Sequence, residues 1–439
     1  MIAKMTAYNQ QVKRLLPGGV HYNFHLPWEE TPIHFRGAQG SRVTDMDGKE
    51  YLDLYARFGA LIVGHGHPEY NERLKETIDR VLSVSHCDMD AEALEQIHRY
   101  VPSAEMIRFG LSGTEIVQNA LRLARAWTGR NRFVRFEGHY HGNADNIMGG
   151  RTPRVGAPIP SDYFGDLKGT QGRARDSLES QSYLLPWNDA DALEALLKAE
   201  AADIAAVIME PVCVNGGGVM PAEGYLQQVR DLCDEYEVVL IFDEIITGFR
   251  MGLGGAQETF GVKPDLTTLG KAIGGGGVPV SALVGKEEIM KLLVDKRVIH
   301  AGTFNGYPLG TAAIVATLDI LGRDQGRALE AMNDTAGILH DVLLAEAAGA
   351  GLPLIVQGPP GCASYHCCNE PLTRTSQYTF ELMSLDIILN NKLAQHGILV
   401  SSISRMYPNI MLEPRDVAWF RERVGAAIAE TKELYDELI

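Results

Sequence analysis

One lysine, Lys271, lies between a lone glycine and a run of four glycines in the segment TTLGKAIGGGGVP. A lysine amine that burial keeps neutral is nucleophilic and condenses with carbonyl compounds to a Schiff base. A lysine in a solvated loop is the more common case, because lysine side chains are rarely buried. If Lys271 is the nucleophile, we expect the glycines to leave room around it for a large ligand.

An acidic residue, Asp243, directly follows the apolar run VVLIF at residues 238–242. Burying an unpaired carboxylate is costly, since desolvation opposes the charged form. We therefore expect a cation beside Asp243, either on a ligand or on an arginine such as Arg250, unless Asp243 caps the following helix. A cationic ring nitrogen would meet this need.

A third segment, LSGTE at residues 111–115, could bind a phosphate group. Ser112, Gly113 and Thr114 lie where a helix is expected to begin. Backbone N–H groups at a helix N-terminus, together with two hydroxyls, form an anion site. The alternative is an ordinary N-cap with Glu115 in the first helical turn.

The segment EGHYHG at residues 137–142 holds one aromatic ring between two histidines and two glycines. Tyr140 could therefore lie flat against a planar ligand. His139 and His141 are candidate metal ligands, but no acid or cysteine nearby completes a set. No metal site is predicted.

Short apolar runs alternate with helix-like stretches between about residues 105 and 300. Six runs are predicted to be strands: MIRFG (106–110), RFVRF (132–136), IAAVIM (204–209), VVLIF (238–242), DLTTL (265–269) and VSALVG (280–285). Residues 114–129 are predicted to form a helix that ends at Gly129. This alternation is typical of an α/β domain with a mostly parallel sheet, in which ligands bind beyond the carboxyl ends of the strands.

Both ends of the chain differ in composition from its middle. LLPGG and DMDGKEY predict an N-terminal arm and a small hairpin, and helical runs near 328–347 and 416–438 predict a helical C-terminal part. We predict an arm at 1–55, a large ligand-binding domain at 56–315 and a C-terminal part at 316–439. The first and last of these are expected to form one smaller domain.

The bulk composition argues against several classes of partner. The 439 residues are 45% hydrophobic and 22% charged, and the formal net charge is −16. A nucleic acid or an acidic membrane surface would need a basic footprint, so neither is expected as a partner. No apolar run is long enough to span a bilayer, and the first residues lack the apolar stretch of a signal peptide. With six irregularly spaced cysteines, the sequence predicts a cytoplasmic protein.

Taken together, these features meet the needs of one cofactor, pyridoxal 5′-phosphate. Its phosphate needs an anion site, its ring an aromatic face, its pyridine nitrogen a carboxylate, and its aldehyde a lysine. The ring would accept the electron pair released at the α-carbon of a substrate. Lys271, joined to the cofactor as the internal aldimine, would then move a proton as general base and acid.

Several motifs occur in an order that is shared with a known family: VPSAEMIRFGLSGTE, FEGHYHG, IMEPVCVNGG, VVLIFDEIITGFRMGLGGAQETFGVKPDLTTLGKAIGGG and AGTFNGYPLG. In these motifs the chain resembles the class-III (fold type I) pyridoxal-phosphate-dependent aminotransferases, and within them most closely the glutamate-1-semialdehyde 2,1-aminomutase subgroup. The resemblance implies a mostly parallel, seven-stranded-type sheet with helices on both faces. It also implies a smaller α+β domain built from both termini.

The family pattern implies a role for each matching residue of this chain. Lys271 would form the Schiff base, Asp243 would bind the pyridine nitrogen, and Tyr140 would pack on one ring face. The other implied contacts are Ser112, Gly113 and Thr114 with the phosphate, Glu210 and Asn215 near the ring hydroxyl, and Ile245 on the other ring face.

The resemblance further implies a homodimer with a shared active site. Thr303, in AGTFNG, would reach the phosphate bound by a second subunit. The small-molecule partners would be an amine or amino acid and a keto acid.

The chain departs from the aminomutase pattern where the substrate should bind. The subgroup's PGGVNSPVRAF is here PGGVHYNFHLP, so that His25 replaces the arginine expected to bind the substrate carboxylate. A neutral histidine lacks the bidentate fork of arginine. Arg57, in YARFGAL, replaces a small residue and could bind an anion in its place, or pair with an acid at the surface.

Three reactions remain open on this scaffold. The first is an aminotransferase that moves an amino group between an amine or amino acid and a keto acid or aldehyde through pyridoxamine phosphate. The alternatives are an aminomutase that runs both half-reactions on one substrate, and an amino-acid racemase or epimerase. A nucleotide-dependent dehydrogenase is not supported, because neither GxGxxG after the first α/β strand nor GxxxxGK(S/T) occurs.

Overall fold

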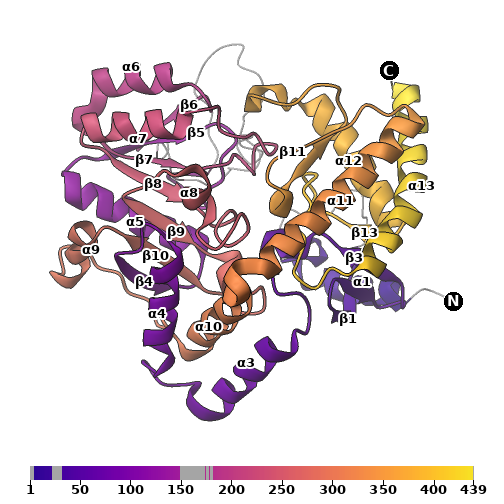
Figure 1. Ribbon diagram of the computed structural model, residues 1–439, viewed down its shortest axis with the longest axis horizontal. Helices are drawn as coiled ribbons and strands as arrows, with labels where there is room; N and C mark the ends of the chain where they lie inside the picture. Colours follow the sequence, from indigo (N-terminus) through magenta and orange to yellow (C-terminus); the bar gives the residue numbers. More distant parts are fainter. Residues whose placement is uncertain (1–3, 22–31, 149–173, 175–176, 178–180, 439) are drawn as a thin grey trace. The chain divides into compact units, whose positions relative to one another are not determined.

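The computed structural model describes residues 4–21, 32–148, 174, 177 and 181–438 (Figure 1). The chain divides into two compact units, each of which is described by itself. Unit 1 consists of Met1–Pro68, Glu330–Pro371 and Phe380–Ile439, and unit 2 consists of Glu69–Leu329 and Leu372–Thr379. The domain boundaries expected from the sequence stay a prediction.

Unit 2 is built around a seven-stranded sheet (Figure 1). In spatial order its strands are β4 (Met106–Gly110), β10 (Ser281–Gly285), β9 (Leu266–Leu269), β8 (Val239–Asp243), β7 (Ile204–Met209), β5 (Arg132–Phe136) and β6 (Ser182–Leu185). β10 runs antiparallel to both of its neighbours, and the other paired strands are parallel. The predicted α/β fold with a mostly parallel sheet is confirmed.

The central strands are buried on both faces, which explains their composition. Every residue of β7 and β8 is buried, and a strand covered on both faces is a continuous apolar run. All six predicted strands are present, with ends that agree within one residue. The sequence does not predict β6, because SYLL is too short for a period to be recognised.

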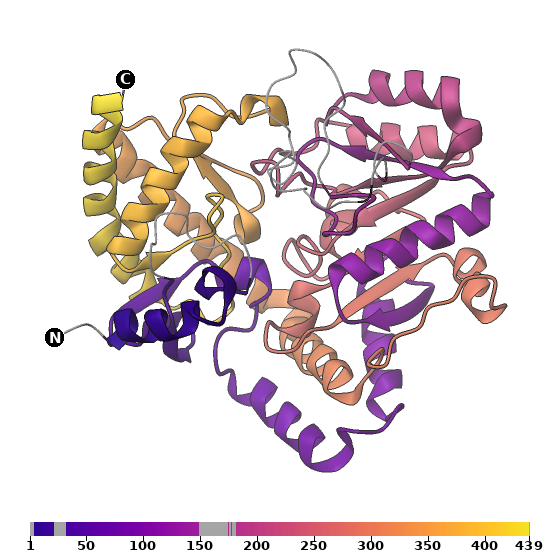
Figure 2. The ribbon, with the colours of Figure 1, turned by 180° about the vertical axis from the view of Figure 1, so that it is seen from behind.

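Helices pack against this sheet. The helices of unit 2 are α3 (Pro68–Val81), α4 (Met89–Tyr100), α5 (Gly113–Thr128), α6 (Ala190–Glu200), α7 (Tyr225–Glu235), α8 (Gly255–Phe260), α9 (Glu287–Val294) and α10 (Pro308–Gly322). α5 contacts β7, β8, β9 and β10, and it crosses the sheet in the foreground of Figure 2. It corresponds to the predicted helix at 114–129. Ser112 caps its start, and Gly129, with a φ of +72°, ends it.

Unit 1 contains strands and helices from both ends of the chain. Its sheet has the order β1 (Phe35–Gln39), β2 (Arg42–Asp45), β3 (Glu50–Asp53) and β13 (Ile398–Leu399), and β11 (Ile355–Gln357) pairs with β12 (Ser364–His366). Its helices are α1 (Lys4–Lys13), α2 (Ala56–Gly59), α11 (Arg327–Ala350, which begins in unit 2), α12 (Phe380–Gln395) and α13 (Pro414–Leu438). The hairpin predicted from DMDGKEY joins β2 and β3. Its turn is closed by Asp45, whose Oδ1 accepts from three successive N–H groups, those of Asp47, Gly48 and Lys49.

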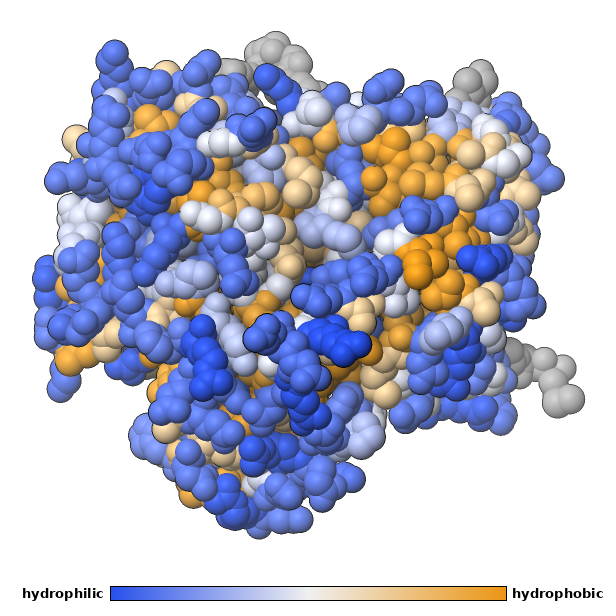
Figure 3. Space-filling view, in the orientation of Figure 1, coloured by the Kyte–Doolittle hydropathy of each residue, from blue (hydrophilic) through white to orange (hydrophobic). Residues whose placement is uncertain are grey.

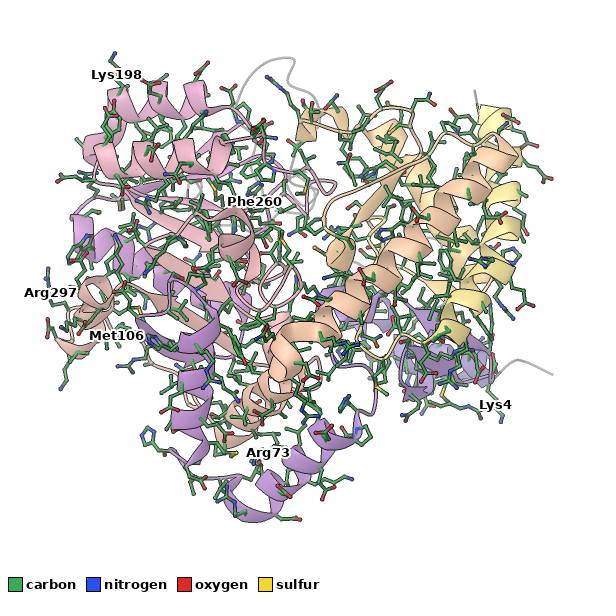
Figure 4. All side chains as sticks on the ribbon, viewed as in Figure 1. Lys4, Arg73, Met106, Lys198, Phe260 and Arg297 are labelled. Carbon is green, nitrogen blue, oxygen red and sulfur yellow. The ribbon has the colours of Figure 1, made fainter. Side chains whose placement is uncertain are left out.

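The surface over α3 and α10 is mostly hydrophilic in the view of Figure 3. A hollow of about 250 Å³ between these helices is lined by Glu69, Glu72, Arg73, Glu76, Ala316, Asp319, Ile320 and Arg323. Arg323 pairs with Glu69, and Arg73, which is labelled in Figure 4, lies 3.9 Å from Asp319. Ion pairs therefore hold the walls of this hollow. Among the helices described, none is long and apolar enough to cross a membrane.

Candidate active site

Asp243 lies at the carboxyl end of β8 and is only 4% exposed. Its Oδ2 is 2.7 Å from Nδ1 of His141. Its Oδ1 accepts from the hydroxyl of Thr268 at 3.0 Å and from the N–H of Ile245 at 3.1 Å. Polar partners on both oxygens offset the cost of burying the acid. They also fix its orientation at the edge where α/β sheets bind ligands.

The pairing of Asp243 with His141 was missed by the sequence analysis. That analysis considered a ligand cation, Arg250 or a helix cap, and treated His141 only as a candidate metal ligand. His141 follows β5, which is separated from β8 by β7, and these parallel strands bring their carboxyl ends to one edge. The contact depends on strand order, which the sequence does not state. The position of both residues just beyond predicted strands is the one signal that could have suggested it.

Glu210, the first residue after β7, is another buried acid of this edge. Its Oε1 accepts from the N–H of Tyr140 and from Nδ2 of Asn215, both at 2.7 Å. Burial raises the pKa of Glu210, while His141 and the hydrogen bonds to the carboxylate oppose the rise. The N–H of Glu210 donates to Nδ1 of His139 at 2.9 Å. Burial lowers the pKa of His139 well below its ordinary value, so this imidazole is a neutral acceptor.

Ser112, Gly113 and Thr114 lie at the N-terminus of α5, as predicted. Ser112 Oγ accepts from the N–H of Glu115 at 3.3 Å, so the serine is the helix cap. The hydroxyl of Thr114 donates to Oδ1 of Asn143 at 3.1 Å. The cap satisfies one helix N–H group, and those of Gly113 and Thr114 have no partner among the described residues. The segment therefore serves as a cap and still offers N–H groups to an anion.

Tyr140 and Ile245 belong to the same cluster as Asp243. Tyr140 is partly buried, and burial followed by the charge of Asp243 raises the pKa of its phenol. Ile245 packs against two glycines. A Cβ added to Gly113 would lie 3.1 Å from Ile245 Cδ1, and one added to Gly270 would lie 2.9 Å from it. Ile245 thus joins the start of α5 to the residue that precedes Lys271.

Lys271 begins the 3-10 turn η3 (Lys271–Gly274), just beyond β9. In the ladder between β8 and β9, Asp243 is paired with Thr268, three residues before the lysine. The φ of Lys271 is +45°, a left-handed value that costs energy for a residue with a Cβ atom. Backbone strain of this kind concentrates at functional sites.

The glycines after Lys271 do not all leave room for a ligand. A Cβ on Gly275 would lie 2.6 Å from the ring of Tyr70 and 2.7 Å from Oγ1 of Thr317. A Cβ on Gly277 would lie 2.9 Å from the same ring. Protein side chains fill the space beside these two glycines, so the expectation of room for a ligand is wrong for them.

Arg57, a candidate substrate residue, lies on an unusual turn in unit 1. The φ angles of Ala56, Arg57 and Phe58 are +46°, +52° and +58°, so α2 is one turn of left-handed helix. Asp53 supports this turn, since its Oδ1 accepts from the N–H groups of Tyr55 and Ala56 at 3.1 and 2.8 Å. The side chain of Arg57 is exposed.

Two further predicted residues stay predictions in their roles. Thr303 is exposed in unit 2, and its proposed contact is with a second subunit. His25 lies outside the described residues. Within the part of the chain that the structure describes, no three His, Cys, Asp or Glu side chains form a group that could hold a metal.

The donors at this edge of the sheet fit pyridoxal 5′-phosphate. The open N–H groups of Gly113 and Thr114 suit a phosphate, and the oriented carboxylate of Asp243 suits a cationic ring nitrogen. Tyr140 supplies an aromatic ring, and Lys271 supplies an amine next to β9. A seven-stranded, mostly parallel sheet with these residues beyond its strands defines a fold type I pyridoxal-phosphate enzyme.

The aminotransferase class-III family model matches residues 26–355. The chain belongs to this family, and it is a pyridoxal-phosphate-dependent enzyme. The cofactor predicted from the sequence is confirmed, since it is that of the class-III aminotransferase family.

Named relatives make the similarity more specific. The chain is 39% identical to a glutamate-1-semialdehyde 2,1-aminomutase from Ignicoccus hospitalis over 341 residues, which are 77% of this chain and 78% of the relative. It is 35% identical to a protein of the same name from Syntrophobacter fumaroxidans over 96% of both chains. Among solved structures, an omega-transaminase from Sphaerobacter thermophilus matches with a TM-score of 0.89 at 28% identity, over 98% of both chains.

These comparisons bear differently on the predicted reactions. The predicted aminotransferase activity is supported at the level of the family. The two sequence relatives named above are 2,1-aminomutases by name, which is the reaction predicted here as the alternative to the aminotransferase.

Proposed function

We propose that this chain moves an amino group between neighbouring carbons of one small substrate, as a 2,1-aminomutase does, and that this substrate is glutamate-1-semialdehyde. Relatives with 35–41% identity over most of the chain carry this activity in their names. The structural observation that carries the amino-group chemistry is the buried Asp243, paired in register with Thr268 three residues before Lys271.

In this proposal, each group of the cofactor has a matching residue. Asp243 would bind the pyridine nitrogen, and the amine of Lys271 would bind the aldehyde carbon. The remaining proposed contacts are Ser112, Gly113 and Thr114 with the phosphate, Tyr140 and Ile245 with the two ring faces, and Glu210 and Asn215 with the ring hydroxyl.

Bound pyridoxal phosphate supplies a ring that accepts the electron pair released when a bond at the substrate carbon breaks. The Nζ of Lys271 would take the proton from that carbon as general base and give it to carbon C4′ of the cofactor as general acid. His141, 2.7 Å from Asp243, would keep the carboxylate oriented toward the ring nitrogen. The buried Glu210 would hold the backbone of Tyr140 in place through their 2.7 Å hydrogen bond.

The test supplies purified, cofactor-loaded protein with glutamate-1-semialdehyde alone, without an added amino acceptor. We expect the isomer that carries the amino group on the neighbouring carbon, because an aminomutase completes both half-reactions on one molecule. Chromatography of the products measures it, and Lys271→Ala is the inactive control. Turnover that requires a separate keto acid or aldehyde would contradict the aminomutase and support the second candidate.

The second candidate is an aminotransferase that acts between an amine or amino acid and a keto acid or aldehyde. The observation that favours it is Arg57, which stands on a left-handed turn where the aminomutase pattern has a small residue, while His25 replaces the expected arginine. In this candidate Arg57 binds the substrate carboxylate. Arg57→Ala should then raise the KM of a carboxylate-bearing amine and leave that of an amine without a carboxylate unchanged.

We also propose that the active protein is a cytoplasmic homodimer. Thr303 lies in an exposed segment that includes Phe304, 59% exposed, and Ile299, 69% exposed. Apolar side chains this exposed are suited to a protein interface. In the dimer, Thr303 would contact the phosphate bound by the second subunit.

A further inference from the structure

The hydroxyl of Tyr70 lies within the glycine-rich loop that follows Lys271. Tyr70 is in the first turn of α3 and is 4% exposed. Its hydroxyl donates to the carbonyl of Gly274 at 2.6 Å. Burial raises the pKa of Tyr70, and the nearby backbone of Gly277 and Val278 opposes the rise. The side chain therefore bonds to the loop at Gly274 and lies close to its backbone again at Gly277.

The ring of Tyr70 also fits the loop closely. Gly275 and Gly276 have φ angles of +69° and +101°, which residues with a Cβ rarely adopt. A Cβ on Gly275 or on Gly277 would lie within 3 Å of ring atoms of Tyr70, at 2.6 and 2.9 Å. The glycines thus allow the backbone to lie directly on the ring. This contact accounts for part of the glycine run without any ligand.

A second tyrosine holds the far end of the same loop. Tyr307, the residue before α10, donates its hydroxyl hydrogen to the carbonyl of Pro279 at 3.0 Å. Thr317 of α10 lies beside Gly275. The loop from Gly274 to Pro279 is therefore attached by side chains from α3 and from the start of α10.

The backbone of Lys271 is strained at the point where the chain enters this loop. Its φ of +45° belongs to the turn η3, in which the N–H of Ile273 donates to the carbonyl of Gly270 at 3.1 Å. The turn passes directly into four glycines, which have more conformational freedom than other residues. Without an anchor at Gly274, the turn could relax, and the amine of Lys271 would sample more positions.

We propose that Tyr70 is a positioning residue for Lys271, which holds the loop through Gly274 so that the lysine amine meets the cofactor aldehyde at a fixed place. The proposal rests on the proposed role of Lys271 as the residue that binds the cofactor. It adds a residue that lies 204 positions away from Gly274 in the chain.

The test compares Tyr70→Phe with Tyr183→Phe. The first variant removes only the hydroxyl and keeps the ring against the glycines. The control removes a tyrosine hydroxyl that accepts from Arg132 at 2.6 Å on the edge strand β6, which β5, β7 and β8 separate from β9 and the glycine loop. Three quantities are measured: the dissociation constant of pyridoxal phosphate, the pH midpoint of the visible absorbance of the loaded protein, and the rate at which an amine reagent labels Lys271 in the cofactor-free protein, followed by peptide mapping.

For Tyr70→Phe we expect the affinity for pyridoxal phosphate to fall about tenfold, because a buried carbonyl loses its hydrogen bond. The pH midpoint should move by about half a unit, and the labelling rate of Lys271 should change. The kcat should fall more than the KM rises. Tyr183→Phe should match the wild type in all of these measurements.

Wild-type values for Tyr70→Phe, with Lys271 still labelled by borohydride reduction in the wild-type holoenzyme, would overturn the role of Tyr70 and leave the proposed function standing. Equal changes in both variants would also overturn it, since the effect would then be general loss of stability. Labelling of a different lysine in the wild-type holoenzyme would overturn the proposed role of Lys271 and this proposal with it.

Discussion

The candidate site depends on individual side chains whose partners are already in place. Both oxygens of Asp243 are occupied by protein donors, and Glu210 is bonded to Tyr140 and Asn215. Preorganised polar groups of this kind need little rearrangement when a charged ligand binds. The site therefore offers charge in fixed directions.

Asp243→Asn should weaken cofactor binding by more than about tenfold and slow proton removal from the substrate by orders of magnitude, because a neutral amide cannot stabilise a protonated ring nitrogen. Absorbance titration with pyridoxal phosphate and single-turnover kinetics measure the two effects. Asp203→Asn, which alters a surface pair with Arg132 at 3.2 Å, is the matched control. If Asp243→Asn kept the affinity and the rate of the wild type, the proposed role of Asp243 in binding the ring nitrogen would be wrong.

His141→Leu should also weaken cofactor binding, because it leaves Oδ2 of Asp243 buried without its partner. Removing one member of a buried pair typically costs about 3–5 kcal/mol. In a double-mutant cycle with Asp243→Asn, the loss of cofactor affinity in the double variant should be smaller than the sum of the two single losses, since both substitutions act through the same contact. Strict additivity in the cofactor dissociation constants would mean that His141 does not act through Asp243.

His340, on α11 of unit 1, makes the stability of that unit sensitive to acid. Burial lowers the pKa of His340 to about 4, and Asp341 opposes the shift. In the unfolded chain the imidazole takes up a proton below its ordinary pKa of about 6.5. Between these two values the unfolded state binds more protons, so stability falls as the pH is lowered from 6.5 toward 4, by about 3 kcal/mol in all.

Thermal unfolding at a series of pH values checks this dependence. His340→Leu should remove most of the decline between pH 6.5 and 4, whereas His86→Leu, whose side chain is 92% exposed, should not. An unchanged pH profile in His340→Leu would assign the acid sensitivity to other groups.

At the scale of elements, the left-handed turn α2 is held by close packing. Gly59 has a φ of +82°, and a Cβ added there would lie 2.7 Å from the ring of Tyr407. Gly59→Ala should therefore destabilise the protein by more than about 2 kcal/mol, since backbone strain and a clash add. Gly351 also has a positive φ, +71°, but a Cβ added there would meet no atom closer than 3.8 Å. Gly351→Ala should therefore lower the free energy of unfolding only through backbone strain, by about 1 kcal/mol. Chemical denaturation measures both, and equal losses would show that Tyr407 is no obstacle.

The elements differ in how far the sequence could predict them. β7 and β8 were predictable because burial on both faces leaves continuous apolar runs, and α5 because its ends carry a serine cap and a glycine. The left-handed turn was not, because Ala56, Arg57 and Phe58 give no local signal for a positive φ. The partners of Asp243 and the contact of Tyr70 with the glycine loop were also out of reach, since they depend on the order of strands and on helices far away in the sequence.

At the scale of the whole molecule, the chain has a net charge of −16 and two units, and none of the described sheets is shared between them. Unit 2 contains the candidate contacts for the cofactor, while Arg57 belongs to unit 1. The residues proposed to bind the cofactor therefore belong to a different unit from this candidate substrate residue. Changes in substrate preference could then arise in unit 1 without altering the cofactor contacts.

The proposed dimer gives the last prediction. If the segment around Thr303 enters a second subunit, Phe304→Glu should shift the protein toward monomer, because a charge would replace an apolar side chain in the interface. Light scattering measures the mass, and cofactor affinity should fall together with the dimer fraction. Leu434→Glu, at an exposed apolar position on α13, should change neither quantity.

Thr303→Ala should leave the dimer intact and lower only the affinity for the cofactor, because the proposed contact with its phosphate is lost. A wild-type monomer that binds pyridoxal phosphate and turns over at full rate would exclude a shared site.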